Sequence, residues 1–362
     1  MAVEAVSKTT TGKWDFKALA PLRRNTPPQT VELREDQQER IPIYEQALTV
    51  SVNSKVANPK FSNYFVKEGV ITDSHALPAG NVEYGSCQAL HGEESAVAAH
   101  RSSLSLSGGN HPDNLVLGII AGNPGNVPSP CGNCRDIMRD TFGTNFEIAS
   151  GTPEGGLAVV VPMSTFTFDT PEEVNINPRR RKSLQVYSAL GMSKSDFKEL
   201  VAKTIKEGKF LTNDPYCPPN IHPERRYYAT IVTNRGLHHG GRDVMAEYHP
   251  IYALRDAVRQ GRREDDSSGI QSVIVVAEDP YMMPDVMYKD RQHLLEFNLQ
   301  GELVEGNEKD PPVFLVSHDE EGKIVQVGKT SVKEWIPLAF SPANFGDEFV
   351  KYLGGYHRNR TK

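Results

Sequence analysis

The second half of the chain repeats the pattern of the first half, and this repeat limits the fold more than any other feature. Three pairs of matching residues stand 156 or 157 positions apart: Ala96 and Ala253, Val116 and Val273, and Arg135 and Arg291. In each half, short apolar runs typical of buried strands alternate with amphipathic segments typical of helices. At 362 residues the chain is too long for one ordinary core. It is therefore expected to fold as two tandem copies of one α/β unit.

Corresponding strands and helices are expected in the two copies. The first copy has a helix-like segment over 34–57 and the runs "FSNYFVKEGVI", "NLVLGIIAG" and "LAVVVPM"; the second has "RRYYATIVTNRG", "IQSVIVVAEDP" and "PVFLVS". The segment "SKSDFKELVAKTIKEG" predicts a helix with Ser195 as its N-cap and Gly208 as its end. Five residues form the apolar face of this helix: Phe197, Leu200, Val201, Thr204 and Ile205.

The same patterns predict the division of the chain. Its parts are an extended N-terminal arm over 1–35, the first unit over 36–175, a linker over 176–192, the second unit over 193–345 and a C-terminal tail over 346–362. The arm is polar and contains proline, so it is not expected to have a core of its own. The basic run within the linker is expected to be a solvated surface patch.

Composition excludes several classes of protein. The chain is 38% hydrophobic and 24% charged, and no apolar run reaches the roughly 18 residues that a membrane span needs. The first thirty residues lack the apolar centre of a signal peptide. A net charge of −6 disfavours binding to a nucleic acid polymer, which depends mainly on lysine and arginine. Four cysteines do not make a disulfide framework, so a cytoplasmic location with reduced thiols is expected.

Two short motifs carry residues that can perform chemistry. "CQALHGEESAVAAH" contains His91 and Glu93, and "SPCGNCRDIMRD" contains Cys131 and Cys134. A lone pair of cysteines at this spacing fits a zinc site, a redox pair or a packed core. The combination His-x-Glu with Pro-Cys-x-x-Cys is the pattern of zinc deaminases. Three protein ligands leave one position of Zn²⁺ open to water, and zinc lowers the pKa of that water to near 7.

The two motifs also fit the local structure expected around them. "CRDIMRDTF" has the apolar spacing of a helix, which would place both cysteines in its first turn. Backbone N–H groups and the helix dipole favour thiolates there. A carboxylate two residues beyond the histidine would reach the metal-bound water without ligating the metal.

These segments resemble the cytidine deaminase family. "SPCGNCRDIMRDTFGTNFE" and "AGNVEYGSCQALHGEESAV" are similar to its two motifs, "FSNYFV" to its Tyr-Ser-x-Phe-x-Val segment, and "TSVKEWIPLAFSP" to its closing segment. The resemblance covers most of 35–175 and, more faintly, 193–345. It implies two three-layer α/β/α domains, each with a mixed sheet of about five strands flanked by helices.

The resemblance also implies a role for each residue of the site. Zn²⁺ would be bound by His91, Cys131 and Cys134, and Glu93 would be the catalytic residue that moves protons. The residues expected to contact the substrate are Asn81 and Glu83 at a ribose hydroxyl, Tyr64 beside the base, and the Gly92 N–H and the Ser129 carbonyl at the polar edge of the base.

The sequence departs from the family in two places. The first ligand is more often a cysteine, with an arginine after the catalytic glutamate, whereas this chain has His91 and Glu94. One neutral imidazole and two thiolates balance the charge of Zn²⁺, so no arginine is needed. A contact between Glu94 and the substrate is left open. The stretch between Asn81 and His91 is also one residue shorter than usual.

The second copy has lost the motif. At the constant spacing, the residues that correspond to the ligands and the catalytic glutamate are Tyr248, Pro250, Met287 and Asp290. The second copy is therefore expected to bind no zinc and to act as a structural partner. Family members typically build each active site with neighbouring subunits, so a chain of two such units is expected to form a homodimer.

The function expected from the sequence is hydrolytic deamination of a small molecule. The substrate would be an amino-pyrimidine nucleoside, that is cytidine, deoxycytidine or a close analogue, which loses its amine as ammonia. One alternative is a modified nucleoside or a guanidine- or amidine-like natural product. Another is a non-catalytic scaffold stabilised by zinc.

Overall fold

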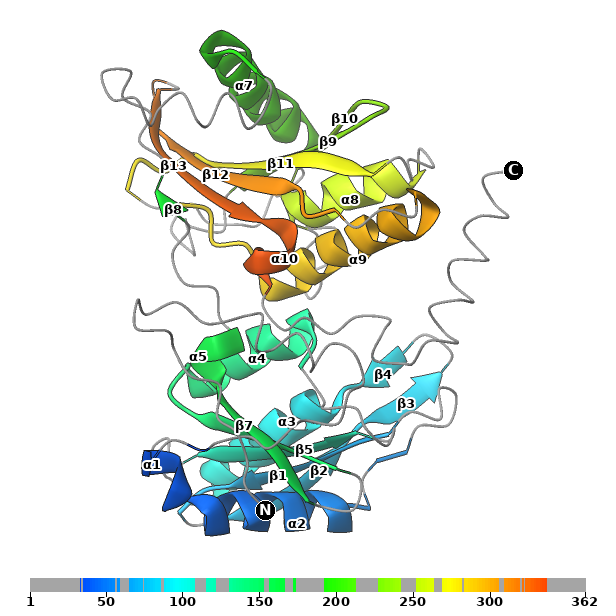
Figure 1. The fold of residues 1–362 in the computed structure, drawn as a ribbon, viewed down its shortest axis with the longest axis vertical. Helices are drawn as coiled ribbons and strands as arrows, with labels where there is room; N and C mark the ends of the chain where they lie inside the picture. The colour runs from blue at the N-terminus through cyan, green and yellow to red at the C-terminus, as the bar shows by residue number, and fades with distance from the viewer. Residues whose placement is uncertain are drawn as a thin grey trace. The chain divides into compact units, whose positions relative to one another are not determined.

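The computed structural model describes residues 33, 35–55, 57–58, 65–73, 75–85, 88–107, 115–121, 130–152, 156–166, 172–173, 192–212, 227–241, 252–263, 269–281, 283–305, 309–319, 321 and 323–336. The described residues up to 166 form one compact unit, and those from 172 to 336 form a second (Figure 1). Among them, no helix combines the length and apolar character needed to cross a bilayer.

The first unit is built on a mixed five-stranded sheet. Its strands are β1 (Val66–Ile71), β2 (Ala76–Gly80), β5 (Val116–Ala121), β6 (Glu147–Gly151) and β7 (Leu157–Pro162). They lie in the order β2-β1-β5-β6-β7, in which β5 and β6 are parallel and the other neighbours are antiparallel. A separate hairpin pairs β3 (Val82–Gly85) with β4 (Gln88–Leu90).

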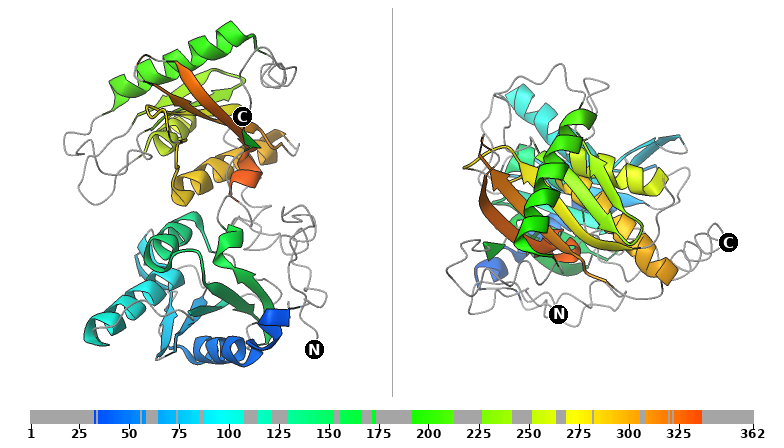
Figure 2. Two further views of the ribbon diagram at one scale, coloured as in Figure 1. Left: turned by 90° about the vertical axis from the view of Figure 1, so that its left-hand side faces the viewer. Right: turned by 90° about the horizontal axis from the view of Figure 1, so that it is seen from above.

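Helices cover both faces of this sheet. They are α1 (Glu35–Gln38), α2 (Ile41–Asn53), α3 (Gly92–Ser107), α4 (Gly132–Phe142) and α5 (Met163–Phe166). Helix α2 packs on one face with Ile71 and Val116, and α3 and α4 pack on the other with Val70 and Leu117. A Cβ at Gly118 would lie 2.6 Å from the backbone of Ala47, so glycine lets α2 approach the sheet closely. The expected three-layer fold is confirmed (Figure 2).

The helix predicted over 34–57 is instead two helices. Helix α1 ends at Gln38, and α2 begins at Ile41, with Pro42 in its first turn. Proline has no N–H to donate, and its ring clashes with the carbonyl four residues earlier. An unbroken helix cannot pass through this position, and proline is well placed at a helix start instead.

The second unit repeats this arrangement. Its strands are β9 (Tyr227–Thr233), β10 (Leu237–Gly240), β11 (Ile270–Ala277), β12 (Pro312–His318) and β13 (Ile324–Ser331), with the short β8 (Glu172–Glu173) at the edge beyond β13. The order β10-β9-β11-β12-β13 and the directions of pairing match those of the first sheet. Its helices are α7 (Lys194–Leu211), α8 (Ala253–Arg263), α9 (Tyr288–Glu305) and α10 (Val332–Trp335).

A buried arginine makes the same contacts in both units. The Arg135 side chain donates to the carbonyl five residues earlier, that of Pro130, and to the carbonyl of Phe166. The Arg291 side chain donates in the same way to the carbonyls of Val286 and Trp335. Each guanidinium also lies over an aromatic ring, Phe166 at 5.0 Å or Trp335 at 4.9 Å. The correspondence of these arginines is a structural equivalence at a spacing of 156 residues.

The predicted pairing of Val116 with Val273 is wrong by one residue. Val116 packs on the sheet face covered by α2, whereas Ile274 and Val276 pack on the face covered by α7, the counterpart of α2. Alternate residues of a strand point to opposite faces, so Val273 faces away from α7. A constant spacing of 156 residues places Ser272 at the position of Val116.

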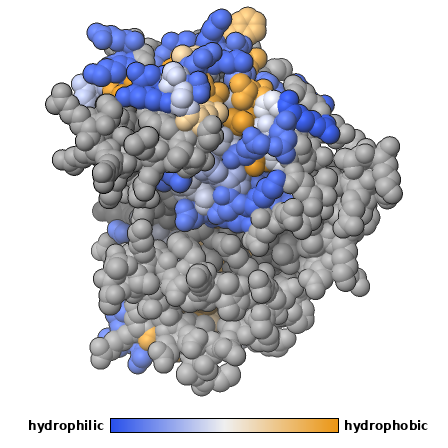
Figure 3. All heavy atoms as spheres, turned by 45° about the horizontal axis from the view of Figure 1, so that its top comes forward, coloured by the Kyte–Doolittle hydropathy of each residue, from blue (hydrophilic) through white to orange (hydrophobic). Residues whose placement is uncertain are grey.

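Helix α7 begins and ends at residues other than those predicted. The apolar face is as expected, with Phe197 fully buried. The N-cap is Ser193 rather than Ser195, and it forms a capping box with Asp196. Gly208 does not end the helix, which continues to Leu211. Figure 3 shows mainly hydrophilic residues on the outward side of this helix.

Candidate metal centre

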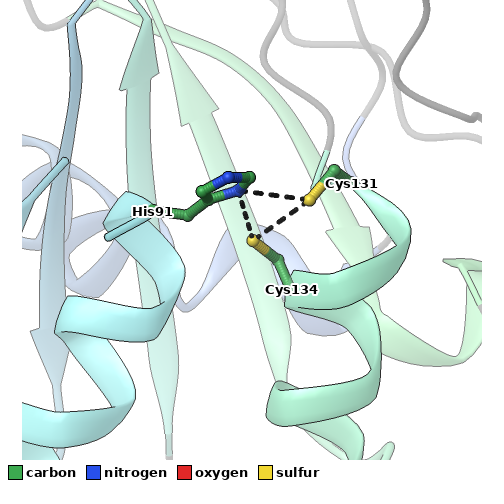
Figure 4. A group of neighbouring side chains, drawn as sticks. All are labelled: His91, Cys131 and Cys134. Carbon is green, nitrogen blue, oxygen red and sulfur yellow. Dashed lines mark hydrogen bonds between the residues drawn. The ribbon is translucent and has the colours of Figure 1, made fainter. Parts of the chain in front are cut away.

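The two motifs meet at the starts of two neighbouring helices of the first unit. Strand β4 leads into His91, which directly precedes α3. Cys131 is the N-cap of α4, and Cys134 is the third residue of that helix. The His91 Nδ1 atom lies 3.3 Å from the Sγ atom of each cysteine, and the two Sγ atoms are 3.4 Å apart (Figure 4). The predicted ligand atoms therefore converge on one point.

This group fits a tetrahedral zinc ion. Zinc binds cysteine sulfur at about 2.3 Å and histidine nitrogen at about 2.0–2.1 Å, so the ligand atoms would stand roughly 3.5–3.8 Å apart. The observed separations are within a few tenths of an ångström of these values. Both cysteines are free thiols. Among the described residues, these three side chains are the one group of histidine, cysteine or acidic side chains close enough together to hold a metal ion.

Glu93 lies against this group. It is the second residue of α3 and is 6% exposed, and its Oε2 atom lies 3.2 Å from the Cys134 Sγ atom. Burial raises the pKa of the Glu93 carboxyl, and the negative charge of Cys131 adds to this effect. A carboxyl with a raised pKa can both take and give a proton near neutral pH.

The ligands hold protons that a metal must displace. The hydrogen bond with Cys134 lowers the pKa of the Cys131 thiol against the opposing effect of burial, and the hydrogen bond with His91 lowers it further. Burial raises the pKa of the Cys134 thiol. The hydrogen bond with Cys131 raises the pKa of His91 to about 9. Zinc binds thiolates and neutral imidazole, so binding at neutral pH would release protons.

Glu94 joins the two helix starts. One oxygen of its carboxylate accepts from the backbone N–H of His91 at 2.7 Å, as the third residue of a helix does in a capping box. The other oxygen accepts from the Asn133 side chain of α4 at 2.5 Å. The sequence left open whether Glu94 contacts the substrate. In the structure, each of its carboxylate oxygens accepts a hydrogen bond from one of the two segments that carry the predicted ligands.

The residues predicted to contact the substrate are placed only in part. Asn81 is buried, and its side-chain oxygen accepts from the N–H of Val66. Glu83 is half-buried in β3, opposite Ala89 of β4. Asn81 directly precedes β3 and Glu83 lies in it, so both are close in the chain to the hairpin whose other strand leads into His91. Tyr64 and Ser129 lie outside the described residues. The roles of all four in substrate binding stay predictions.

Gly92 adjoins a residue that sequence reasoning missed. Gly92 is buried as the first residue of α3, and a Cβ there would lie 2.7 Å from the Oε1 atom of Glu68. Glu68 is fully buried in β1, beneath the first turn of the helix. The sequence signal for Glu68 was a charged residue directly before the apolar residues "GVI" of this strand. The predicted contact of the Gly92 N–H with a base stays a prediction.

The second unit has no such centre among its described residues. Met287 and Asp290 occupy the positions that correspond to the two cysteines, at the start of α9, and both are buried. The Oδ2 atom of Asp290 lies 3.4 Å from the hydroxyl of Tyr227. Tyr248 and Pro250 lie outside the described residues. The described part of the second unit fills this place with packed side chains.

The chain was compared with protein families, curated proteins and solved structures. No protein-family model matches the chain, and no curated protein does. Among solved structures, the cytidine deaminase from Burkholderia pseudomallei is 22% identical, with 35% of this chain and 95% of that chain covered and a TM-score of 0.29. The cytidine deaminase from Mycobacterium leprae is 29% identical, with 33% and 90% covered and a TM-score of 0.24. That from Mycobacterium tuberculosis is 26% identical, with 29% and 79% covered and a TM-score of 0.23. Over about a third of its length, the chain is structurally similar to cytidine deaminases.

Proposed function

We propose that the first unit is a zinc-dependent hydrolase that removes the amine of an amino-pyrimidine nucleoside, such as cytidine or deoxycytidine. One observation carries this proposal. Three ligand atoms of His91, Cys131 and Cys134 lie 3.3–3.4 Å from one another, and a buried carboxyl of Glu93 touches the group without being needed as a ligand.

The ligand set suits catalysis better than a purely structural role. Structural zinc sites normally use four protein ligands, whereas catalytic sites use three and leave one position open. Zinc bound here would supply hydroxide at neutral pH by lowering the pKa of a bound water. His91 and the two cysteines would hold the ion, and Glu94 would keep the helix start that follows His91 close to the start of α4.

Glu93 would move the protons of the reaction. Hydrolysis adds the oxygen of water to the ring carbon that bears the amine, and the amine leaves as ammonia. The carboxylate of Glu93 would take one proton from the water and give it to the ring nitrogen. It would then take the second proton from the newly added oxygen and give it to the departing amine. Its burial keeps its pKa above the usual range, which fits a group that must both accept and donate.

The test is ammonia release, measured over a panel of nucleosides, free bases and guanidine or amidine compounds, together with zinc analysis. Wild-type protein should bind zinc and deaminate an amino-pyrimidine nucleoside. Glu93→Gln should keep its zinc and lose about 10²–10⁴-fold in rate, because glutamine cannot accept a proton.

The neighbouring Glu94 provides a matched control. Glu94→Gln makes the same chemical change one residue away, at a carboxylate engaged by His91 and Asn133. It should reduce zinc occupancy rather than the rate per bound zinc. Loss of zinc from Glu93→Gln would show that Glu93 is a ligand. Activity on guanidine or amidine compounds alone would reassign the substrate, and zinc binding without any turnover would favour a scaffold.

A further inference from the structure

Helix α8 of the second unit has a strongly basic outer side. The helix lies on the face of the second sheet that α7 does not cover (Figure 1). Its inner side is apolar and buried, and includes Leu254 and Val258. Arg255 is half-buried on the outer side, and the other arginines there are exposed. Together these residues form the basic face of α8: Arg255, Arg259, Arg262 and Arg263.

Acidic side chains of the second unit do not neutralise the basic face of α8. Among the described residues, no side chain forms a hydrogen bond or an ion pair with any of the four arginines. The acidic residue of α8, Asp256, accepts from the backbone N–H of Gly241 at 3.3 Å. Arg259 stands four residues after Arg255 and four before Arg263, and like charges at this spacing repel each other on a helix.

The fold does not require this concentration of charge. Arginines of the last turn interact favourably with the helix dipole, but Arg255 and Arg259 stand too early in the helix for this effect. In the first unit the equivalent helix is α3, and a spacing of 157 residues aligns the buried positions of the two helices. Ala98 and Ser102 of α3 stand at the positions of these two arginines, and both are exposed. The same helix therefore forms in the first unit without a basic face.

Helix α7 shows how an ordinary solvated charged face differs. It carries five lysines but also three acidic residues. Two of these acids, Glu199 and Glu207, each stand four residues from Lys203, a spacing at which opposite charges attract. Lys209 forms an ion pair with Glu278. The positive charge of α7 is thus largely balanced nearby, whereas that of α8 is not.

The spacing of the basic face fits a row of carboxylates. Its charges recur at each turn of the helix, which is about 5–6 Å along the axis. Alternate residues of an extended peptide stand about 6.6 Å apart, close enough for flexible arginine side chains to reach each one. The guanidinium group can bind a carboxylate through two parallel hydrogen bonds. An acidic segment could therefore engage several of these arginines in succession.

A nucleic acid fits the basic face less well. Proteins that bind single strands combine positive charge with aromatic side chains on which the bases stack, and α8 contains no aromatic residue. The net charge of the whole chain is −6, which opposes attraction of a long polyanion, whereas a short acidic segment needs only the local charge. We propose that the basic face of α8 binds an extended segment of a partner protein in which aspartate or glutamate recurs at alternate positions.

Fluorescence anisotropy with full-length protein tests this proposal. The probe is a short labelled peptide of alternating glutamate and serine, and the same peptide with glutamine in place of glutamate is the neutral control. Wild type should bind the glutamate peptide at low salt and should not bind the glutamine peptide. Binding should weaken as salt rises, because exposed charges are screened. No binding at low salt, or binding that salt does not weaken, would overturn the proposal.

A triple variant locates the binding surface. Arg259→Gln, Arg262→Gln and Arg263→Gln together should weaken binding roughly 30-fold, since one exposed ion pair contributes about threefold. A matched control removes the same number of exposed charges from α7. It should weaken binding less than about threefold, and equal losses in the two variants would refute a role of α8 itself. The control changes are Lys198→Gln, Lys203→Gln and Lys206→Gln.

Two further outcomes would assign the basic face to another occupant and so overturn the proposal. One is tighter binding of a short oligothymidylate than of the glutamate peptide, lost in the arginine variant, which would indicate a nucleic acid. The other is a homodimer in analytical ultracentrifugation that the arginine variant dissociates and the lysine variant does not, which would indicate a second copy of this chain. Both variants replace exposed side chains, so each should unfold at about the wild-type temperature.

Discussion

Replacing Arg135 by methionine should weaken zinc binding although arginine never touches the metal. The Arg135 side chain is fully buried, and it donates at 2.9 Å to the carbonyl of Pro130, the residue directly before Cys131. It donates at 3.3 Å to the carbonyl of Phe166. The arginine therefore fixes the approach of the chain to the first cysteine, while methionine fills the space without donating.

The size of the effect follows from these contacts. A hydrogen bond from a charged donor contributes about 1.5–3 kcal/mol, and two are lost. Methionine also removes the cost of burying a charge, so the free energy of unfolding of the first unit should fall by about 2–4 kcal/mol. Groups that orient metal ligands typically change metal affinity by about 10–100-fold, and we expect a loss of zinc affinity in this range.

The second unit supplies the control for this experiment. Arg291→Met removes the equivalent contacts with Val286 and Trp335, in a unit whose described residues include no such group of ligands. Zinc affinity would be measured by competition with a coloured chelator, and stability by thermal unfolding. Both variants should be destabilised, but only Arg135→Met should lose zinc affinity. Equal losses of affinity in the two variants, or no loss in Arg135→Met, would refute the argument.

Three further predictions follow from single sites. Zinc affinity should rise with pH through the neutral range, because zinc displaces a proton from Cys134, whose pKa is raised by burial, and one from His91, whose pKa is raised to about 9 by the hydrogen bond with Cys131. Calorimetry in buffers of different ionisation enthalpy would count the released protons, and an affinity independent of pH would contradict these pKa shifts. Gly208→Ala should destabilise the second unit by about 1–3 kcal/mol in chemical denaturation, because its Cβ would lie 2.5 Å from the Tyr228 ring, and an unchanged midpoint would show that the ring moves aside freely. Glu83→Gln should reduce kcat/KM about 10–100-fold for a nucleoside and hardly at all for the free base, if Glu83 binds a ribose hydroxyl; equal losses on both would mean that it only shapes the hairpin.

The centre could be predicted from the sequence because its geometry is local. His91 and Glu93 are two residues apart at one helix start, and Cys131 and Cys134 are three apart at another, so spacing alone fixes most of their relative positions. The alternation of strand and helix patterns also predicted the repeat of one α/β unit, because buried strands and amphipathic helices have distinct periodicities. The three layers were expected from the resemblance to cytidine deaminases. The spacing within each motif does not show that the starts of α3 and α4 lie side by side. The order of strands in the sheet places them together.

The contacts that were missed depend on packing across the sheet. Glu68 lies in a strand, and nothing in the spacing of "VKEGVI" tells which helix residue will lie above it. The partner of Glu94 is Asn133, on another helix. The pairing of Val116 with Val273 failed because a shift of one residue in a strand reverses its face, while the apolar composition hardly changes. Sequence patterns that use apolar content alone cannot detect such a shift.

The second unit indicates whether a metal in the first unit would serve the fold or the chemistry. Both units share the order of strands and a buried arginine. In the first unit this arginine joins the segment before α4 to the last residue of α5, and in the second it joins the segment before α9 to the last residue of α10. The second unit forms this framework with Met287 and Asp290 where the first has cysteines. The framework therefore does not require zinc to form, unlike small zinc-stabilised domains, in which binding of the metal supplies the folding free energy. Since the fold does not need the ion, the three-ligand group of the first unit, with a buried acid at Glu93, is better explained by chemistry than by stability.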